Sequence, residues 1–336
     1  MRKTVIFLSL FFISCPLLTL GGKALSSDSS PPRFLEASVP DEESVRLTFD
    51  KKCAVVENRL MIGELSVSEI QTSEDGIITV KTAPQIPGKE YVVDITVTDG
   101  AGNTTTLLWA FYGFNSRLPT IQLNEISVNA SGNNHADAVE LLCLSNGNLA
   151  GMCLYEGSPA DFDTLFVFPN VEVKKGEMIL VHYKPEGLPE EVQELNALDE
   201  SGGKNSHPNA RDFWVEGGDG LTGTNGALTL YNTPGGRLIE AFLYSNRTTA
   251  SDTAYNGFGS DSFLINVTEI TEAGGWNWPL GQPRPEDCVH SKGITSTRTV
   301  NRRPNSPSGT KESWFIGATS SASLGETNTT EEYSSS

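Results

Sequence analysis

The segment Glu90-Tyr91-Val92-Val93-Asp94-Ile95-Thr96-Val97-Thr98 decides the fold class, because its apolar side chains at 91, 93, 95 and 97 alternate with polar ones. A period of two residues is typical of a β-strand with one face in a core. The pattern recurs in the runs Val45–Phe49 and Ile78–Val80, which turns containing glycine bound, and Phe34–Ser38 and Thr104–Phe114 are counted as edge or closing strands. About seven short strands in this region indicate a sandwich of two antiparallel sheets.

Length and charge limit the function classes. The 336 residues suffice for about two domains, and the formal net charge of −18 argues against a nucleic-acid partner, which needs clustered cations. A short basic cluster of Arg298, Arg302 and Arg303 lies among Pro, Asn and Ser, and we interpret it as a solvated loop. Alternation continues through the second half, with helical period only near Leu188–Leu198. We therefore predict an all-β protein.

The amino end predicts export. Two basic residues precede the mostly apolar run Val5–Leu20, which is too short for a comfortable membrane span but suits a signal peptide. Within it, Phe12-Ile13-Ser14-Cys15 resembles the lipobox of bacterial lipoproteins, so Cys15 is the predicted lipid-attachment site. Ordinary signal-peptidase cleavage near Gly21 or Ala24 is the alternative. Residues 1–22 form the predicted leader, and residues 23–32 form a polar linker.

The first domain carries a family resemblance. The strand Gly88-Lys89-Glu90-Tyr91 leads toward the turn Asp99-Gly100-Ala101-Gly102-Asn103. This order resembles bacterial immunoglobulin-like (Ig-like) modules, in which a Gly-Lys-x-Tyr strand is followed by an Asp-x-x-Gly-Asn turn. The resemblance implies an Ig-like β-sandwich over residues 33–117.

The second domain, residues 119–328, resembles lamin-tail domains. Ile121-Gln122-Leu123-Asn124-Glu125-Ile126 and then Asp137-Ala138-Val139-Glu140-Leu141 are similar to that family's first two strands. Further segments follow in the family's order: Phe166–Pro169, Val173–Val181, Gly226–Asn232, Leu238–Tyr244, Ser296–Arg298, Ser313–Phe315 and Ser323–Asn328. The resemblance implies a second Ig-like sandwich, here enlarged by long loop insertions near Lys184–Leu221 and Arg247–Ser296. Residues 329–336 are polar and are predicted to be a disordered tail.

The insertions hold Trp214, Trp276 and Trp278. Exposed aromatic residues serve as anchors for sugars or protein partners, so these three are candidate binding residues. Buried plugs between the insertions and the sandwich explain them equally well.

Four cysteines lie beyond the leader: Cys53, Cys143, Cys153 and Cys288. Their spacing matches no zinc site, and export favours disulfides. Cys143 and Cys153 lie across an expected turn, so this pair is the favoured disulfide. The alternative is that both are buried as small apolar residues.

Candidate chemistry is sparse. Glu125, Glu140 and His135 could form an improvised hydrolase site, although two glutamates at strand ends can equally hydrogen-bond backbone groups and stabilise the sandwich. His135, Asp137 and Glu140 could touch a metal, but Asp137 and Glu140 point to opposite faces of a regular strand. We therefore predict no catalytic residues, no metal and no cofactor.

These features together predict a bacterial lipoprotein. We expect a non-catalytic binding and scaffolding module of the cell envelope that acts through loops of its second domain. It is anchored to a membrane by lipid, as in the outer membrane of a spirochaete, or it is secreted. The partner is an unknown protein or glycan. The alternative is the hydrolase.

Overall fold

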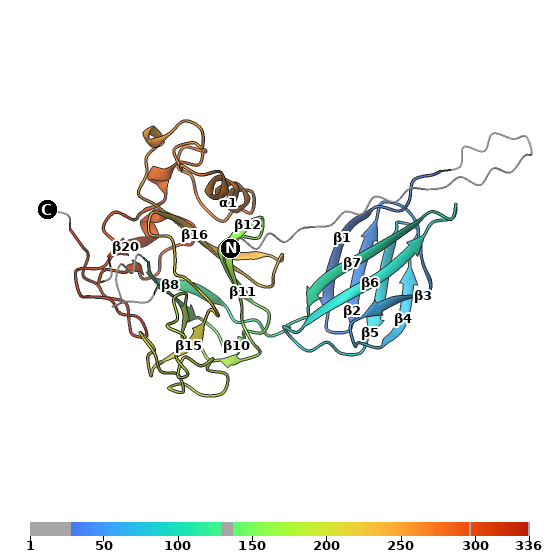
Figure 1. Cartoon of the computed structure of the whole chain (residues 1–336), viewed down its shortest axis with the longest axis horizontal. Coiled ribbons are helices and arrows are strands. Elements are labelled where there is room, and N and C mark those ends of the chain that lie inside the picture. Colours follow the sequence, from blue (N-terminus) through green and yellow to red (C-terminus); the bar gives the residue numbers. More distant parts are fainter. Residues whose placement is uncertain (1–27, 129–136, 296, 335–336) are drawn as a thin grey trace, which may run out of the picture. The chain divides into compact units, whose positions relative to one another are not determined.

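The computed structural model describes residues 28–128, 137–295 and 297–334 (Figure 1). Strands account for 41% of the residues and helices for 7%, which confirms the predicted all-β class. The leader with Cys15 and the segment with His135 lie outside the described residues. The chain divides into two compact units: the first comprises residues up to Gln85 with Glu90–Phe111, and the second comprises Ile86–Lys89 and the chain from Tyr112.

The first unit consists of two sheets. The four-stranded sheet has the order β1 (Phe34–Asp41), β2 (Ser44–Phe49), β5 (Ile77–Thr82), β4 (Val67–Thr72). The three-stranded sheet has the order β3 (Ala54–Ile62), β6 (Glu90–Thr98), β7 (Thr104–Tyr112). The β1–β2, β2–β5, β4–β5 and β3–β6 pairs are antiparallel.

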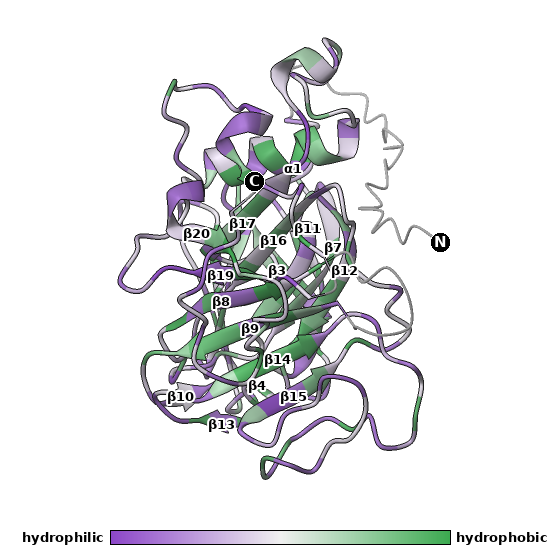
Figure 2. Ribbon diagram, turned by 90° about the vertical axis from the view of Figure 1, so that its left-hand side faces the viewer, coloured by the Kyte–Doolittle hydropathy of each residue, from purple (hydrophilic) through white to green (hydrophobic). Residues whose placement is uncertain are grey.

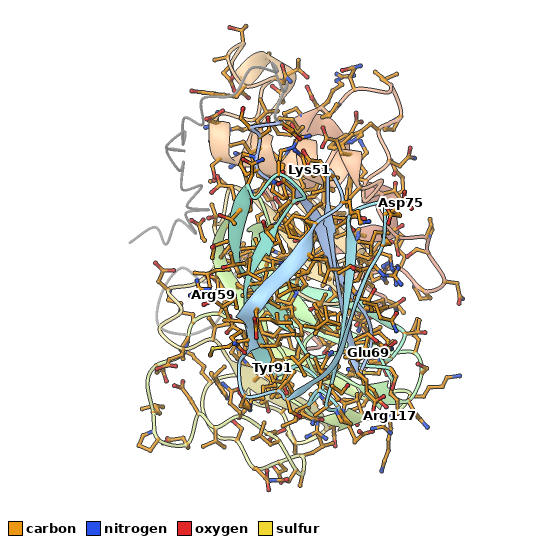
Figure 3. The ribbon with its side chains drawn as sticks, turned by 90° about the vertical axis from the view of Figure 1, so that its right-hand side faces the viewer. Lys51, Arg59, Glu69, Asp75, Tyr91 and Arg117 are labelled. Atoms are coloured by element: carbon orange, nitrogen blue, oxygen red, sulfur yellow. The ribbon has the colours of Figure 1, made fainter. Side chains whose placement is uncertain are left out.

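The alternating residues of β2, β5 and β6 form the core of this unit. The buried cluster includes Val45, Leu47, Phe49, Ile78, Val80, Tyr91, Val93, Ile95 and Val97, as the sequence pattern predicted. Charged side chains such as Arg59, Glu69 and Asp75 are exposed, whereas Tyr91 is buried (Figure 3).

The second unit has two larger sheets. The six-stranded sheet has the order β15 (Ala210–Trp214), β14 (Met178–His182), β9 (Ala138–Cys143), β8 (Ile121–Ser127), β19 (Val300–Arg302), β20 (Trp314–Ile316). The five-stranded sheet has the order β12 (Asp161–Val167), β11 (Cys153–Ser158), β16 (Asn225–Tyr231), β17 (Leu238–Ser245), β18 (Val289–His290). A short pair, β10 (Gly147–Asn148) with β13 (Glu172–Val173), lies apart from both. The β14–β15 and β17–β18 pairs are parallel.

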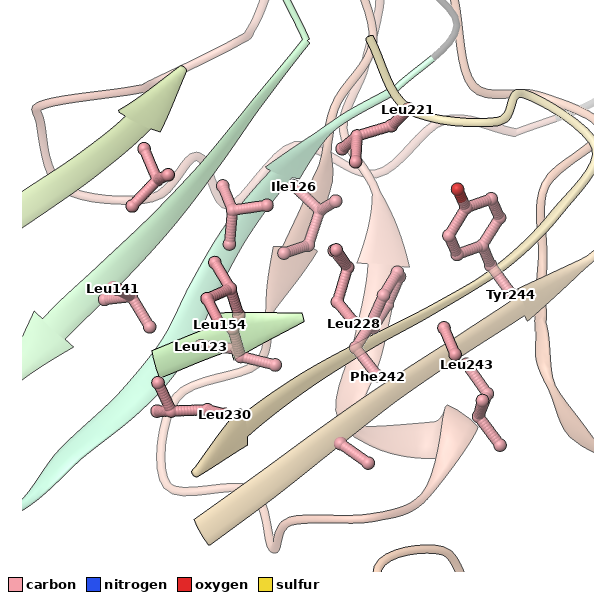
Figure 4. Packing of buried hydrophobic residues seen from close by; sticks show 14 of the residues in the cluster. Leu123, Ile126, Leu141, Leu154, Leu221, Leu228, Leu230, Phe242, Leu243 and Tyr244 are labelled. Atoms are coloured by element: carbon pink, nitrogen blue, oxygen red, sulfur yellow. The ribbon is translucent and has the colours of Figure 1, made fainter. Parts of the chain in front are cut away.

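Leucine-rich faces of both sheets meet in one core. Leu123, Ile126 and Leu141 come from the six-stranded sheet, and Leu154, Leu228, Leu230 and Phe242 come from the five-stranded sheet (Figure 4). Hydrophobic residues follow strands such as β9 and β14, whereas the connecting loops are mostly polar (Figure 2). Burial of these apolar faces positions β8 and β9, which are buried at nearly every residue and carry the candidate site.

The second insertion contains a helix that the sequence pattern did not predict. α1 (Asp261–Glu272) begins after Ser260, whose hydroxyl accepts a hydrogen bond from the Phe263 amide at 3.0 Å. Phe263, Val267 and Ile270 lie on its buried face and join the core. The helical period predicted near Leu188–Leu198 is wrong, because those residues form turns and bends.

Three single-turn 3₁₀ helices complete the structure: η1 (Thr249–Ser251), η2 (Pro285–Asp287) and η3 (Lys311–Ser313). Within the described ranges, every helix is too short or too polar to span a bilayer.

Candidate functional site

Two glutamates lie side by side on the outer face of the six-stranded sheet. Leu123 pairs with Leu141 and Glu125 pairs with Glu140, so Asn124 is an extra residue and forms a β-bulge. The bulge allows Leu123 and the next apolar residue, Ile126, to enter the core together. Glu125 and Glu140 consequently project away from the core on one face of the sheet.

The C-terminal segment, residues 317–334, buries Glu125 completely. Its Oε1 accepts hydrogen bonds from the Ser323 amide (2.9 Å) and the Thr299 hydroxyl (2.6 Å), and its Oε2 accepts one from the Ser323 hydroxyl (2.6 Å). Burial raises the pKa of Glu125, and the hydrogen bonds from Ser323 and Thr299 oppose that shift.

Glu140 is buried in the same way. Its Oε2 accepts a hydrogen bond from the Gly325 amide (2.6 Å), and its Oε1 accepts one from Asn124 Nδ2 (2.5 Å). Burial raises the pKa of Glu140 to about 8, and the charge of Glu125 adds to the increase. Asn124 also donates to Asn328 Oδ1 (2.7 Å), so the pair and the C-terminal segment form one buried network.

The structure therefore brings together two of the three predicted hydrolase residues, and His135 lies outside the described residues. Every oxygen of the two carboxylates already accepts a hydrogen bond from the protein. Two pockets, of about 310 and about 560 Å³, are lined by other residues. Within residues 28–128, 137–295 and 297–334, no three His, Cys, Asp or Glu side chains are placed to hold a metal ion.

The first insertion covers the same face beside the glutamates. It supplies β15, where Trp214 stacks on His182 with ring centroids 4.0 Å apart and donates its indole N–H to the Ser201 hydroxyl (2.8 Å). His182 Nε2 lies 2.6 Å from Asp212 Oδ1, and His182 Nδ1 has no partner within the described part of the chain. The Glu194 carboxylate accepts hydrogen bonds from the backbone amides of Glu200, Ser201 and Asp212, and these bonds hold the insertion in place. The sequence analysis named Trp214 but missed its partners His182 and Asp212, because His182 lies 30 residues before Asp212 and no motif links the two.

The other two candidate tryptophans pack between the second insertion and the sheets. Trp276 donates to the Asp287 carbonyl (3.1 Å), and Trp278 donates to the Thr271 hydroxyl (2.9 Å). Trp214, Trp276 and Trp278 are only 3%, 5% and 8% exposed. The prediction that they are exposed binding anchors is wrong, since apolar burial has turned all three into plugs.

A buried ion pair ties the two sheets together. Arg302 in β19 forms an ion pair with Glu240 in β17. Arg302 Nε donates a hydrogen bond to the Leu123 carbonyl (2.9 Å), and Glu240 Oε2 accepts one from the Leu123 amide (2.8 Å). Burial lowers the pKa of Arg302 to about 10. Interpreting Arg302 as part of a solvated basic loop was therefore wrong, and only its neighbours Arg298 and Arg303 reach the surface.

The end of the chain is also ordered further than predicted. Residues 317 and 332 form a β-bridge, and the Tyr333 amide donates to the Ile316 carbonyl at 2.8 Å. Arg303 pairs with Glu332, and the Arg298 guanidinium lies 4.0 Å from the Tyr333 ring centroid. These contacts correct the prediction of a disordered tail for residues 329–334, since the polar tail docks on Arg298 and Arg303, which flank β19.

The predicted Cys143–Cys153 disulfide is absent. Cys53, Cys143, Cys153 and Cys288 are all free and buried. Cys143 ends β9 and belongs to the main core, whereas Cys153 begins β11 and packs with Tyr155 and Tyr231 in a separate cluster. Both thiols behave as small apolar residues, and burial raises the pKa of Cys143 to about 12 and that of Cys153 further.

We expect none of these four thiols to react with iodoacetamide in the folded protein, because each is buried and protonated. After unfolding in guanidinium without a reductant, all four should be alkylated, as measured by intact and peptide mass spectrometry. Cys143→Ala should remove one label. Two cysteines that are labelled only after reduction would show that a disulfide exists.

Comparison with known proteins places this architecture in a family. A family model described as "protein second domain" (TP_1001_2nd) matches residues 119–316. A 164-residue stretch is 27% identical to an uncharacterized protein of Treponema pallidum (strain Nichols) and covers 47% of this chain. That stretch spans 40% of the relative, so the similarity is to part of it. The matched range contains β8 through β20, and the chain belongs to the TP_1001_2nd second-domain family.

Proposed function

We propose that this chain is an exported, non-catalytic cell-envelope protein that binds or scaffolds a protein or glycan through loops of its second domain. In this proposal the amino-terminal leader is processed at Cys15, which carries the lipid anchor. The basic start, the apolar run and the Phe12-Ile13-Ser14-Cys15 motif support it. Similarity to a Treponema pallidum protein supports a spirochaete source.

The strand order supports an Ig-like first domain. The sheet order β1-β2-β5-β4 corresponds to strands A, B, E and D of a constant-type immunoglobulin domain. The order β3-β6-β7 corresponds to strands C, F and G of its second sheet. The lamin-tail assignment of the second domain is supported by strands at the quoted motifs. These include β8, β9 and the β16–β17 hairpin. Resemblance to lamin-tail domains implies a scaffold or interaction role, and surface loops on such a sandwich fit a binding role.

One observation carries the proposal. Glu125 and Glu140 are the carboxylates that could serve as a general acid and base, yet both are buried. Their oxygens accept hydrogen bonds from four residues of the protein: Ser323, Thr299, Gly325 and Asn124. A general acid or base has to reach a substrate proton, either directly or through a water molecule. Here both carboxylates instead attach the C-terminal segment to the sheet, which favours a structural role.

The test uses the mature, full-length protein in two arms. In the first, the wild type should enter the detergent phase on Triton X-114 partitioning, and Cys15→Ser should remain in the aqueous phase. In the second, the protein should bind ligands on glycan and envelope-protein arrays without converting them. Glu140→Gln should leave array binding unchanged.

Chromogenic ester, glycoside and phosphodiester substrates provide the opposing readout. Turnover of any of them that Glu140→Gln or Glu125→Gln abolishes, in a protein that binds nothing on the arrays, would replace the binding proposal with the hydrolase. Aqueous partitioning of the wild type would remove the anchor from the proposal.

A further inference from the structure

The larger pocket lies where three segments of the second unit meet. It has a volume of about 560 Å³, and its lining includes Thr224 before β16, Asn246 after β17, and Lys292, Thr295 and Arg298 after β18. Tyr333 of the C-terminal segment closes one side. We propose that this pocket binds an acidic sugar, with the sugar carboxylate held by Lys292 and Arg298; this assignment rests on the proposed binding function.

Two cations without acidic partners make the pocket unusual. The chain carries a formal net charge of −18, yet neither Lys292 nor Arg298 forms an ion pair with a described residue. By contrast, Arg302 forms an ion pair with Glu240, and Arg303 forms one with Glu332. An anionic ligand would supply the negative charge that these two cations lack within the protein.

Arg298 is held so that its guanidinium remains available. Its Nε donates to the Thr295 hydroxyl (3.3 Å), and its guanidinium carbon lies 4.0 Å from the Tyr333 ring centroid. Its two terminal nitrogens form no hydrogen bond to a residue that the structure describes. A carboxylate can accept from such nitrogens in a bidentate arrangement, with the arginine already positioned.

The pocket is built on the sheet and not on a free loop. Ser291 donates its amide to the Ser245 carbonyl (3.1 Å) and its hydroxyl to the Thr224 carbonyl (2.9 Å), which fixes the start of the Lys292 segment. Gly293 lies against Ile316 and Tyr333, since a Cβ at this position would lie 3.0 Å from Ile316 Cδ1 and 3.4 Å from Tyr333 Cε1. A preformed site loses less entropy when it binds a small ligand.

Size and lining point to a sugar acid in preference to a bare ion. The volume falls in the range of small-molecule sites, roughly 300–1,000 Å³, and exceeds what a single anion fills. The Thr224 and Thr295 hydroxyls and the Asn246 amide can exchange hydrogen bonds with sugar hydroxyls. Only two cations line the pocket, so a short acidic saccharide is better matched than a long polyanion.

The test is calorimetric titration of the full chain with glucuronic acid, with glucose and inorganic sulfate as parallel probes. We expect glucuronic acid to bind, more weakly at high salt, and both other probes to bind at least tenfold more weakly. Arg298→Gln and Lys292→Gln should each weaken glucuronic acid binding about tenfold or more. Arg237→Gln, an exposed arginine in the β16–β17 turn, should bind as the wild type does.

Equal binding of glucose and glucuronic acid would overturn the assignment, as would sulfate binding as tight as that of glucuronic acid. Wild-type affinity in Lys292→Gln would also overturn it, and this exposed side chain can be replaced without touching the fold. If the Lys292→Gln/Arg298→Gln protein retains every array ligand of the wild type, the pocket assignment fails while the general binding function stands.

Discussion

Arg302→Met is expected to lower the free energy of unfolding of the second unit by about 3–5 kcal/mol, because it leaves Glu240 buried without its cation. Glu240 joins the two sheets through Arg302 and the Leu123 amide. Arg302 also bonds the Leu123 carbonyl and lies over Trp314, with 5.0 Å to the ring centroid. One substitution therefore removes several contacts at the joint between the sheets.

Arg303→Met provides the matched control. Arg303 pairs with Glu332 at the surface, with side chains 39% and 51% exposed, so its loss should cost less than about 1 kcal/mol. Urea unfolding followed by tryptophan fluorescence measures both, because Trp214, Trp276, Trp278 and Trp314 lie in the second unit. An equal decrease in the free energy of unfolding for the two substitutions would show that the buried ion pair contributes no more to stability than the exposed one.

A double substitution separates the cost of an unpaired charge from the value of the pair. Arg302→Met with Glu240→Leu removes both charges, and replacement of a buried pair by apolar residues is often neutral. We expect most of the lost stability to return, short of the wild type, because the Leu123 amide loses its acceptor. A double variant as unstable as Arg302→Met alone would contradict this explanation.

The fold could be predicted where apolar residues recur at alternate or consecutive positions of a strand. β2, β5, β6, β16 and β17 each bury alternate or consecutive apolar residues, and their segments were identified from the sequence. β4 exposes all six residues and so has no periodicity to detect. β3 contains a register shift between Val55 and Leu60, with Asn58 at a φ of 57°, which disrupts its alternation.

The helix α1 was hidden by its composition. Ile265, Val267, Thr268, Ile270 and Thr271 are β-branched and favour strands, so the local propensity conflicts with the structure adopted. The spacing of Phe263, Val267 and Ile270 after the Ser260 cap was the available signal. Packing of that face against β11 and β16 decides the outcome.

The candidate site was predictable only in its strands. Glu125 and Glu140 occur in recognisable motifs, but their partners lie 198 and 185 residues further along the chain, at Ser323 and Gly325. No periodicity or spacing in a single sequence links residues so far apart. The same holds for Arg302 and Glu240, and for Lys292 and Tyr333 in the cationic pocket.

The buried glutamates predict an unusual pH dependence, in which the second unit becomes less stable as pH rises from about 4.5 to about 8. Burial raises the pKa of Glu140 to about 8 in the folded state, against 4.5 as its ordinary value. In this window the folded chain retains a proton that the unfolded chain has released, so the free energy of unfolding falls with increasing pH. Glu125 and Glu156, whose pKa burial also raises, act in the same direction.

The expected loss from Glu140 across the window is on the order of 5 kcal/mol, since its pKa differs by about 3.5 units and each unit corresponds to about 1.4 kcal/mol. Urea unfolding at pH values between about 5 and about 9 measures it. Glu140→Gln should flatten the slope, with a remainder from Glu125 and Glu156, whereas the exposed Glu216→Gln should retain the full slope. The slope is the readout, because glutamine also changes the hydrogen bonds to Gly325 and Asn124 at every pH.

A free energy of unfolding that does not decrease from pH 5 to pH 8 would contradict the inference. It would mean that the donors on Glu140, the Gly325 amide and Asn124 Nδ2, stabilise the ionised carboxylate by more than burial destabilises it. The C-terminal segment would then be held by a charge and not by a protonated acid. In that case Glu140→Gln should be about equally destabilising at every pH above about 5.5, because the wild-type carboxylate is then ionised in both states and its charge is lost only at lower pH.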